Sequence, residues 1–133
     1  MAANTRFATG VHALVLLAAE PDKLKTSEEI AERLEINPVV VRRIFSLLGR
    51  AKLLESQKGP HGGSKLARSA KQITLADVYR ALDGGELFHT SRTGSQPAKV
   101  GAALKRAFAR AEEAAREELS RTTLNQIAKK AAK

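Results

Sequence analysis

Between residues 38 and 50, side chains that can contact the edges of DNA bases recur at the spacing of one helix face. The guanidinium group of an arginine can donate two parallel hydrogen bonds to guanine, and a valine can contact the methyl group of thymine. One of the two adjacent arginines could instead bind a phosphate, and the sequence leaves open which one does so. The candidate base-contacting residues are Val39, Arg42, Arg43 and Ser46.

A helix that starts at Pro38 would position these side chains. Asn37 is a favourable N-cap, and proline suits the first helical position because no backbone N–H is required there. The opposite face of the same helix is apolar, so we expect it to be buried and the arginines to be exposed. This apolar face consists of Val41, Ile44, Leu47, Leu48 and Ala51.

A β-hairpin is predicted to follow this helix. Residues 53–58 and 64–67 have the pattern of two short strands, and the glycine- and proline-rich residues 59–63 predict a tight turn between them. A basic helix followed by a basic hairpin is typical of a winged helix-turn-helix, in which the hairpin is the wing. The candidate DNA contacts in the wing are Lys58, Gly59, Pro60 and His61.

The charge of the chain is concentrated on this predicted helix and wing. Residues 36–71 contain eight basic residues and one acidic residue, a net charge of +7, whereas residues 20–35 contain six acidic and three basic residues, a net charge of −3. The whole chain carries +9 at pH 7, which favours a polyanionic partner. The alternative interpretation of the basic stretch is an ordinary solvated face.

Further helices are predicted on both sides of this region. An apolar stripe predicts a first helix over 5–20, and Thr26 with Glu29 has the spacing of a capping box that starts a second helix ending near 35. Ser27 at that start is a candidate phosphate contact, a role compatible with simple capping. Thr74 is the predicted N-cap of a helix that ends at Gly84.

The C-terminal part is predicted to hold a long helix over 98–119 and a short one after it. Five positions of the long helix follow alternating steps of four and three, a seam suited to another helix, so we expect a homodimer. The alternative is a long helix folded back on its own domain. A basic tail from Ala128 is expected to fray. The seam consists of Val100, Leu104, Ala107, Ala111 and Ala114.

The predicted architecture is therefore mainly α with a small β-hairpin wing. We expect a winged helix-turn-helix DNA-binding domain over residues 1–83, a loop over 84–97, and a dimerisation helix with a C-terminal helix over 98–133. A hydrophobic content of 43% is compatible with one folded core of this size.

Several classes of function are excluded or disfavoured. The chain has no cysteine, which excludes disulfides and thiolate metal ligands. No apolar run approaches the roughly 18 residues of a membrane span, and Ala13–Ala19 is too short for a signal peptide, so a cytoplasmic protein with no membrane contact is expected. No Ser/His/Asp arrangement or phosphate-binding glycine motif is recognisable, so we predict no enzymatic activity and no catalytic residues.

The histidines give little support for a metal site. His12 lies among apolar neighbours of the first helix, where a structural role is favoured. His89 lies in the loop, where a histidine can titrate or bind metal, but no suitable set of further ligands is nearby. We predict no metal and no cofactor.

Four segments of the chain, taken in order, form a specific combination, and the Gly-Pro-X-Gly-Gly turn makes it so. The segments are Ser27–Ala31, Asn37–Ile44, Lys58–Gly63 with Leu66–Arg68, and Ile73–Ala81. Together they resemble the Rrf-two family of bacterial winged-helix regulators, which includes the iron–sulfur-cluster regulator, the nitric-oxide-sensing repressor and the cysteine-metabolism regulator. The resemblance covers residues 5–85 closely and the rest by layout.

The resemblance implies a homodimer whose long helices cross near a two-fold axis and whose wings reach a pseudo-palindromic operator. It places the wing tip in or beside the minor groove, where Lys58 would meet a strongly negative potential. It also implies a sensory loop before the long helix, with three cysteines in cluster-binding relatives. Residues 86–100 have none here, so an all-cysteine iron–sulfur cluster and thiol redox sensing are excluded.

The predicted function is sequence-specific binding of a double-stranded DNA operator by a dimeric transcriptional regulator, with a repressor favoured over an activator. A small-molecule effector could bind between the first helix, residues 86–97 and the long helix. An equally open alternative is that this regulator has lost its sensory function. One alternative is a non-specific nucleic-acid-binding protein, suggested by the high charge. Another is a protein-interaction module, against which the exposed arginines argue.

Overall fold

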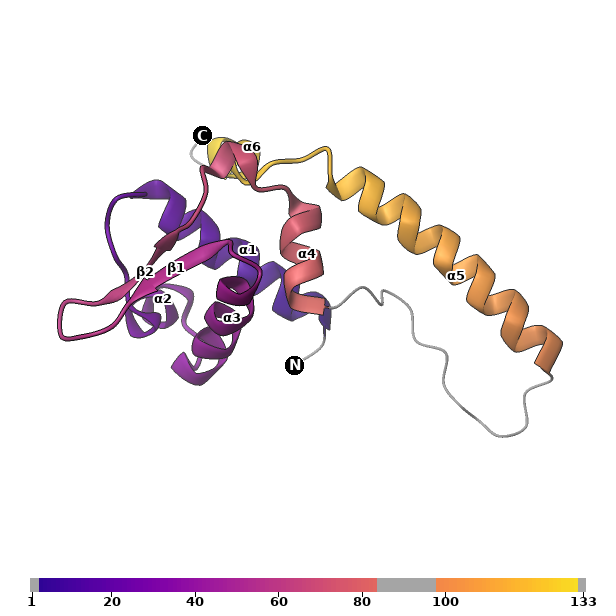
Figure 1. Cartoon of the computed structure of the whole chain (residues 1–133), viewed down its shortest axis with the longest axis horizontal. Helices are drawn as coiled ribbons and strands as arrows, with labels where there is room; N and C mark the ends of the chain where they lie inside the picture. Colours follow the sequence, from indigo (N-terminus) through magenta and orange to yellow (C-terminus); the bar gives the residue numbers. More distant parts are fainter. Residues whose placement is uncertain (1–2, 84–97, 132–133) are drawn as a thin grey trace.

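The computed structural model describes residues 3–83 and 98–131 of the chain. Most of the helices and the hairpin form one body, from which a single long helix projects before the chain returns to that body (Figure 1). The elements in order are α1 (Ala3–Ala19), α2 (Ser27–Leu34), α3 (Pro38–Arg50), β1 (Leu54–Gln57), β2 (Gly63–Leu66), a 3-10 helix η1 (Ala70–Gln72), α4 (Leu75–Asp83), α5 (Ala98–Leu119) and α6 (Leu124–Ala131).

The core lies between α1, α3 and α4. Leu14 and Leu17 of α1 are fully buried, and α1 also contacts α2, β2 and α6. From the other side, α3 contributes the buried residues predicted from its apolar face, while Leu47 is half-buried and Ala51 is exposed. Burying these side chains supplies most of the free energy that holds the helices together. The buried core residues of α3 are Val41, Ile44 and Leu48.

The short helix α6 docks on the body although it follows the projecting α5. Leu124 at its start is fully buried in the same core. The Leu124 N–H donates to the carbonyl of Ile73 at 2.8 Å, and the Leu75 N–H donates to the carbonyl of Thr122 at 2.9 Å. These two hydrogen bonds join the starts of α4 and α6 in a β-bridge between Thr74 and Thr123.

A buried lysine joins α1, the start of α2 and the wing. The Lys25 side chain donates to the carbonyl of Leu16 in the last turn of α1 at 2.9 Å and pairs with the Glu20 carboxylate at 3.1 Å. The hydrogen bond from Lys25 and the nearby charge of Lys23 hold the pKa of Glu20 below its usual value. The backbone of Lys25 also exchanges two hydrogen bonds with Ser64 of β2, at 2.8 and 3.0 Å.

Most of the predicted elements are confirmed, with small differences at their ends. The first helix begins at Ala3, and the last helix continues to Ala131. The expected fraying of the tail from Ala128 stays a prediction. The 3-10 helix η1 was not predicted, nor were the isolated β-bridges between Lys25 and Ser64 and between Thr74 and Thr123. No described helix is long and apolar enough to cross a membrane. Residues 84–97 lie outside the described residues, and the domain boundaries placed there stay a prediction.

The docking of α6 leads to a first prediction. Leu124→Ala should lower the free energy of unfolding by about 2–5 kcal/mol, because it leaves a cavity in the shared core. Lys129→Ala, an exposed change on the same helix, is the control and should have little effect. Urea unfolding followed by circular dichroism at one protein concentration measures both variants. An unchanged midpoint for Leu124→Ala would show that α6 contributes nothing to the folded body.

Candidate nucleic-acid interface

The outer face of α3 carries the predicted base-contacting side chains. All four are exposed, and Val39 is one of the two exposed large hydrophobic residues of the described chain, with 52% of its surface accessible. The exposed part of this side chain could pack against a thymine methyl group. The exposed residues are Val39, Arg42, Arg43 and Ser46, with Arg50 one turn further on.

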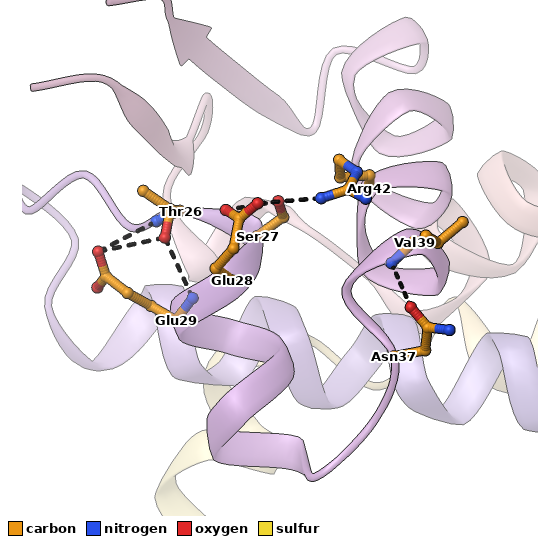
Figure 2. Close-up of polar contacts among 7 residues, drawn as sticks. All are labelled: Thr26, Ser27, Glu28, Glu29, Asn37, Val39 and Arg42. Carbon is orange, nitrogen blue, oxygen red and sulfur yellow. Dashed lines mark hydrogen bonds and ion pairs between the residues drawn. The ribbon is translucent and has the colours of Figure 1, made fainter. Parts of the chain in front are cut away.

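The turn between α2 and α3 fixes where α3 begins. Glu35 ends α2 in the left-handed conformation, with φ 57°, and its N–H bonds to carbonyls of the last turn of α2. Asn37 then adopts an extended conformation, and its Oδ1 accepts a hydrogen bond from the Val39 N–H at 2.9 Å (Figure 2). Pro38 occupies the first turn, as predicted. The two helices therefore meet through a short turn held by several hydrogen bonds.

The start of α2 is held by the predicted capping box. The Thr26 hydroxyl accepts from the Glu29 N–H at 3.1 Å, and the Glu29 carboxylate accepts from the Thr26 N–H at 3.5 Å (Figure 2). Because Thr26 and Glu29 complete this cap between them, the side chains of Ser27 and Glu28 are not needed for it. They face α3 instead.

A small polar network connects the start of α2 to α3. Glu28 accepts a hydrogen bond from the Arg42 guanidinium at 3.0 Å through Oε1 and one from the Ser27 hydroxyl at 3.2 Å through Oε2 (Figure 2). The pKa of the Glu28 carboxyl is lowered by hydrogen bonds from its own backbone N–H and from Ser27, with the charge of Arg42 adding to the effect. The carboxylate is therefore negatively charged at neutral pH.

The wing is a two-stranded antiparallel hairpin. Leu54 pairs with Leu66 and Gln57 with Gly63, while the hydroxyls of Ser56 and Ser64 lie 2.8 Å apart. Gly59 adopts a φ of 109°, which favours glycine. A Cβ atom at Gly62 would lie 2.2 Å from the Gln57 carbonyl oxygen, so the tight return of the chain requires glycine there as well.

The structure brings part of the predicted site together. The start of α2, the outer face of α3 and the wing line one open hollow of about 630 Å³. Val39 and Arg43 lie outside this hollow and line a smaller one with Arg6 of α1. His61 lines neither hollow and is exposed at the wing tip. The predicted residues that line the large hollow are Ser27, Arg42, Ser46, Lys58, Gly59 and Pro60.

Sequence reasoning missed two residues of this surface. Glu28 lies in an acidic stretch at a helix start, where a carboxylate is ordinarily explained by the helix dipole. Arg6 is half-buried beside Asn37 and Arg43, and a single arginine in the first helix gives no signal of that position. Both become visible only when α1, α2 and α3 are placed together.

Metal ligands do not gather in the described part of the chain. Within residues 3–83 and 98–131 no three histidine, aspartate or glutamate side chains lie close enough to hold a metal ion, and the sequence has no cysteine. His12 is exposed and lies beside Leu34 and Ile36, and its structural role stays a prediction. His89 lies outside the described residues.

Comparisons with known proteins show similarity to transcriptional regulators. A protein-family model named Rrf2 and described as "Iron-dependent Transcriptional regulator" matches residues 3–130. YwnA of Bacillus subtilis carries the provisional name of an HTH-type transcriptional regulator. It is 35% identical to this chain, and the match covers 98% of this chain and 93% of YwnA. Other relatives match over a shorter stretch, so that this chain spans about half of their length.

Solved structures of regulators are also similar over nearly the whole chain. T. potens IscR has a TM-score of 0.72 and 26% identity, with 96% of this chain and 85% of that chain covered. CymR, the global cysteine regulator of B. subtilis, has a TM-score of 0.72 and 25% identity, with 94% of both chains covered. The prediction of a non-enzymatic regulator with a winged-helix fold is confirmed.

The cap of α3 leads to a second prediction. Asn37→Ala should lower the free energy of unfolding by about 1 kcal/mol, since the Val39 N–H loses its partner. Asn37→Asp keeps an oxygen acceptor and should remain close to the wild-type stability. Chemical denaturation compares the three proteins. Equal losses for alanine and aspartate would show that the hydrogen bond to Val39 is not what stabilises this helix start.

Proposed function

The chain belongs to the Rrf2 family of winged-helix transcriptional regulators, and we propose that it is a sequence-specific operator-binding protein that acts as a dimeric repressor. As a member of this family it is a DNA-binding transcriptional regulator. The operator specificity, the dimer, the repression of promoters and a cytoplasmic location are the parts that we add as proposals.

The observation that carries operator binding is the convergence of α3, the start of α2 and the wing on one exposed surface. The described residues of this surface are mostly basic or neutral, with Arg42, Arg43 and Lys58 exposed. A helix of 13 residues such as α3 is about 20 Å long, which suits insertion into a major groove about 12 Å wide. The wing would then follow the adjacent backbone or minor groove.

The position of the two arginines supports different roles for them. Arg42 lies next to Ser27 at the start of α2, the helix that crosses the DNA backbone in helix-turn-helix proteins, so we assign both to a phosphate. Arg43 flanks Val39 on the other side of the exposed face and is assigned to a base edge, with Ser46 one turn further on. Lys58, Gly59, Pro60 and His61 are assigned to the wing contact.

The proposed dimer rests on the projecting helix α5. In the single chain Val100 is 48% exposed, the seam positions Ala107, Ala111 and Ala114 are exposed too, and Leu104 is half-buried, so most of this face is open to a partner within the described residues. Small apolar side chains in such a stripe allow a second helix to approach closely. A second copy of α5 is the occupant that we propose.

The charges of α5 favour an antiparallel pair. Residues 98–110 contain four basic and no acidic residues, whereas residues 111–119 contain four acidic residues and one arginine. This order opposes the one that the helix dipole favours, which places acidic residues at the N-terminus. An antiparallel partner would lay each basic half against an acidic half and offset the unfavourable order.

The family description names iron, but the residues of this chain do not fit an iron–sulfur cluster. Thiolates are the usual ligands of such clusters, and the sequence has none. The proposed repressor therefore uses no cluster in any step. It would occupy a promoter by itself, and a small-molecule effector near α1 and α5 stays a prediction.

DNA titrations test the proposed roles of the two arginines. The DNA upstream of its own gene and a scrambled duplex of equal length are titrated by fluorescence anisotropy at two salt concentrations. Arg43→Ala should weaken binding of the upstream DNA by about 5- to 150-fold and affect the scrambled duplex little. Arg42→Ala should weaken both and lower the salt dependence by about one phosphate contact.

Arg33→Ala, an exposed arginine of α2 away from both hollows, is the control and should bind like the wild type. Equal binding of both duplexes by the wild type at matched salt would contradict a regulator of its own gene. Selection of bound genomic fragments would then separate a different operator from a non-specific coating protein.

The dimer is tested with a charged residue in the seam. Ala107→Glu should produce a monomer in size-exclusion chromatography with light scattering, because it buries a carboxylate between the two copies. Ala109→Glu adds the same exposed residue two positions later, on the opposite face of α5, and should stay dimeric. A wild-type monomer, or a dimer that tolerates both changes, would refute the proposed interface.

A further inference from the structure

The Glu28 carboxylate is an acidic group within a surface assigned to DNA. It lines the large hollow together with the wing and α3, and both of its oxygens accept hydrogen bonds from residues assigned to phosphate binding. Arg42 and Glu28 are each more than half exposed, so the pair lies at the surface where DNA would arrive. A carboxylate in this position needs an explanation.

Capping of α2 does not explain it. Glu29 already completes the capping box with Thr26, and a second carboxylate could serve the helix dipole without contacting another helix. Glu28 instead reaches across to Arg42, 14 residues later in the chain (Figure 2). The contact lies between the two helices of the helix-turn-helix and therefore belongs to the DNA-facing surface.

The partners of Glu28 are the ones that a phosphate would use. A guanidinium and a hydroxyl at a helix start are typical donors to a phosphodiester oxygen, and the same two groups hold the Glu28 oxygens here. A DNA phosphate that uses these same donors has to displace the carboxylate from Nη1 of Arg42 and from the Ser27 hydroxyl. Once displaced, the carboxylate remains close to the negatively charged backbone.

We propose that Glu28 limits the affinity for DNA by competing with a phosphate for Arg42 and Ser27. This inference rests on the proposed function, since it requires DNA on the same surface. Both the broken ion pair and the repulsion of the displaced carboxylate oppose binding, whatever the base sequence. Glu28 therefore lowers the affinity for operator and random DNA alike and keeps the bound complex readily dissociable.

The test is a set of variants titrated with a random-sequence duplex and with the DNA upstream of the gene. Glu28→Gln removes the negative charge at nearly constant shape and should tighten binding of both duplexes by roughly three- to tenfold at low salt. The salt dependence should increase by about one phosphate contact. Glu32→Gln, an exposed glutamate of the same helix outside the hollow, controls for net charge.

A double-mutant cycle identifies the mechanism. Competition for Arg42 predicts that Glu28→Gln gains much less in an Arg42→Ala background than in the wild type, because the shared partner is gone. Equal gains in both backgrounds, or equal gains from Glu28→Gln and Glu32→Gln, would reduce the effect to general electrostatics and overturn the proposal. Weaker binding by Glu28→Gln would also overturn it.

The failure of this inference differs from the failure of the proposed function. If the wild type binds neither duplex, the DNA-binding role itself is refuted, and the inference is refuted with it. If the wild type binds DNA and Glu28→Gln binds with the same affinity and salt dependence, only the role of Glu28 is refuted. Circular dichroism of each variant establishes that the fold is retained.

Discussion

The burial of one face of α3 is the constraint on which the rest of this structure depends. Val41, Ile44 and Leu48 are buried in the core where α3 packs against α1, α2, α4 and β1, and this packing decides which side chains of α3 face outward. The exposed arginines of this helix are not part of the buried core. They are available to a partner because the apolar half of the helix supplies the free energy that keeps it in place.

Local signals in the sequence were sufficient for the helices and the wing. Asn37 with Pro38 marks a helix start through backbone chemistry that acts within a few residues, and the glycines of 59–63 are required by the turn itself. Contacts between distant segments could not be predicted in this way. Three contacts illustrate this: the hydrogen bond from Lys25 to the Leu16 carbonyl, the bridge between Thr74 and Thr123, and the Glu28–Arg42 ion pair. None of them produces a periodic pattern in the sequence, since each depends on how whole elements pack.

The site shows the same division between local pattern and packing. Position on an exposed helix face was predictable from period alone, and all four residues of α3 lie there. Their separation into two hollows, with Arg42 beside α2 and Arg43 beside Arg6, was not. His12 has apolar neighbours in sequence, but the helix places its side chain in an exposed position.

The bridge between the starts of α4 and α6 has a mechanical consequence. It anchors the C-terminal end of α5 to the body through a link of four residues, so α5 extends about 33 Å from an attachment point beside α4 and has the geometry of a lever. In a dimer joined through this lever, a tilt of about 10° at the attachment point would displace the far end by about 6 Å. The distance between the two copies of α3, which has to match one helical turn of DNA, would thus be set where α5 joins the body, a place remote from the DNA.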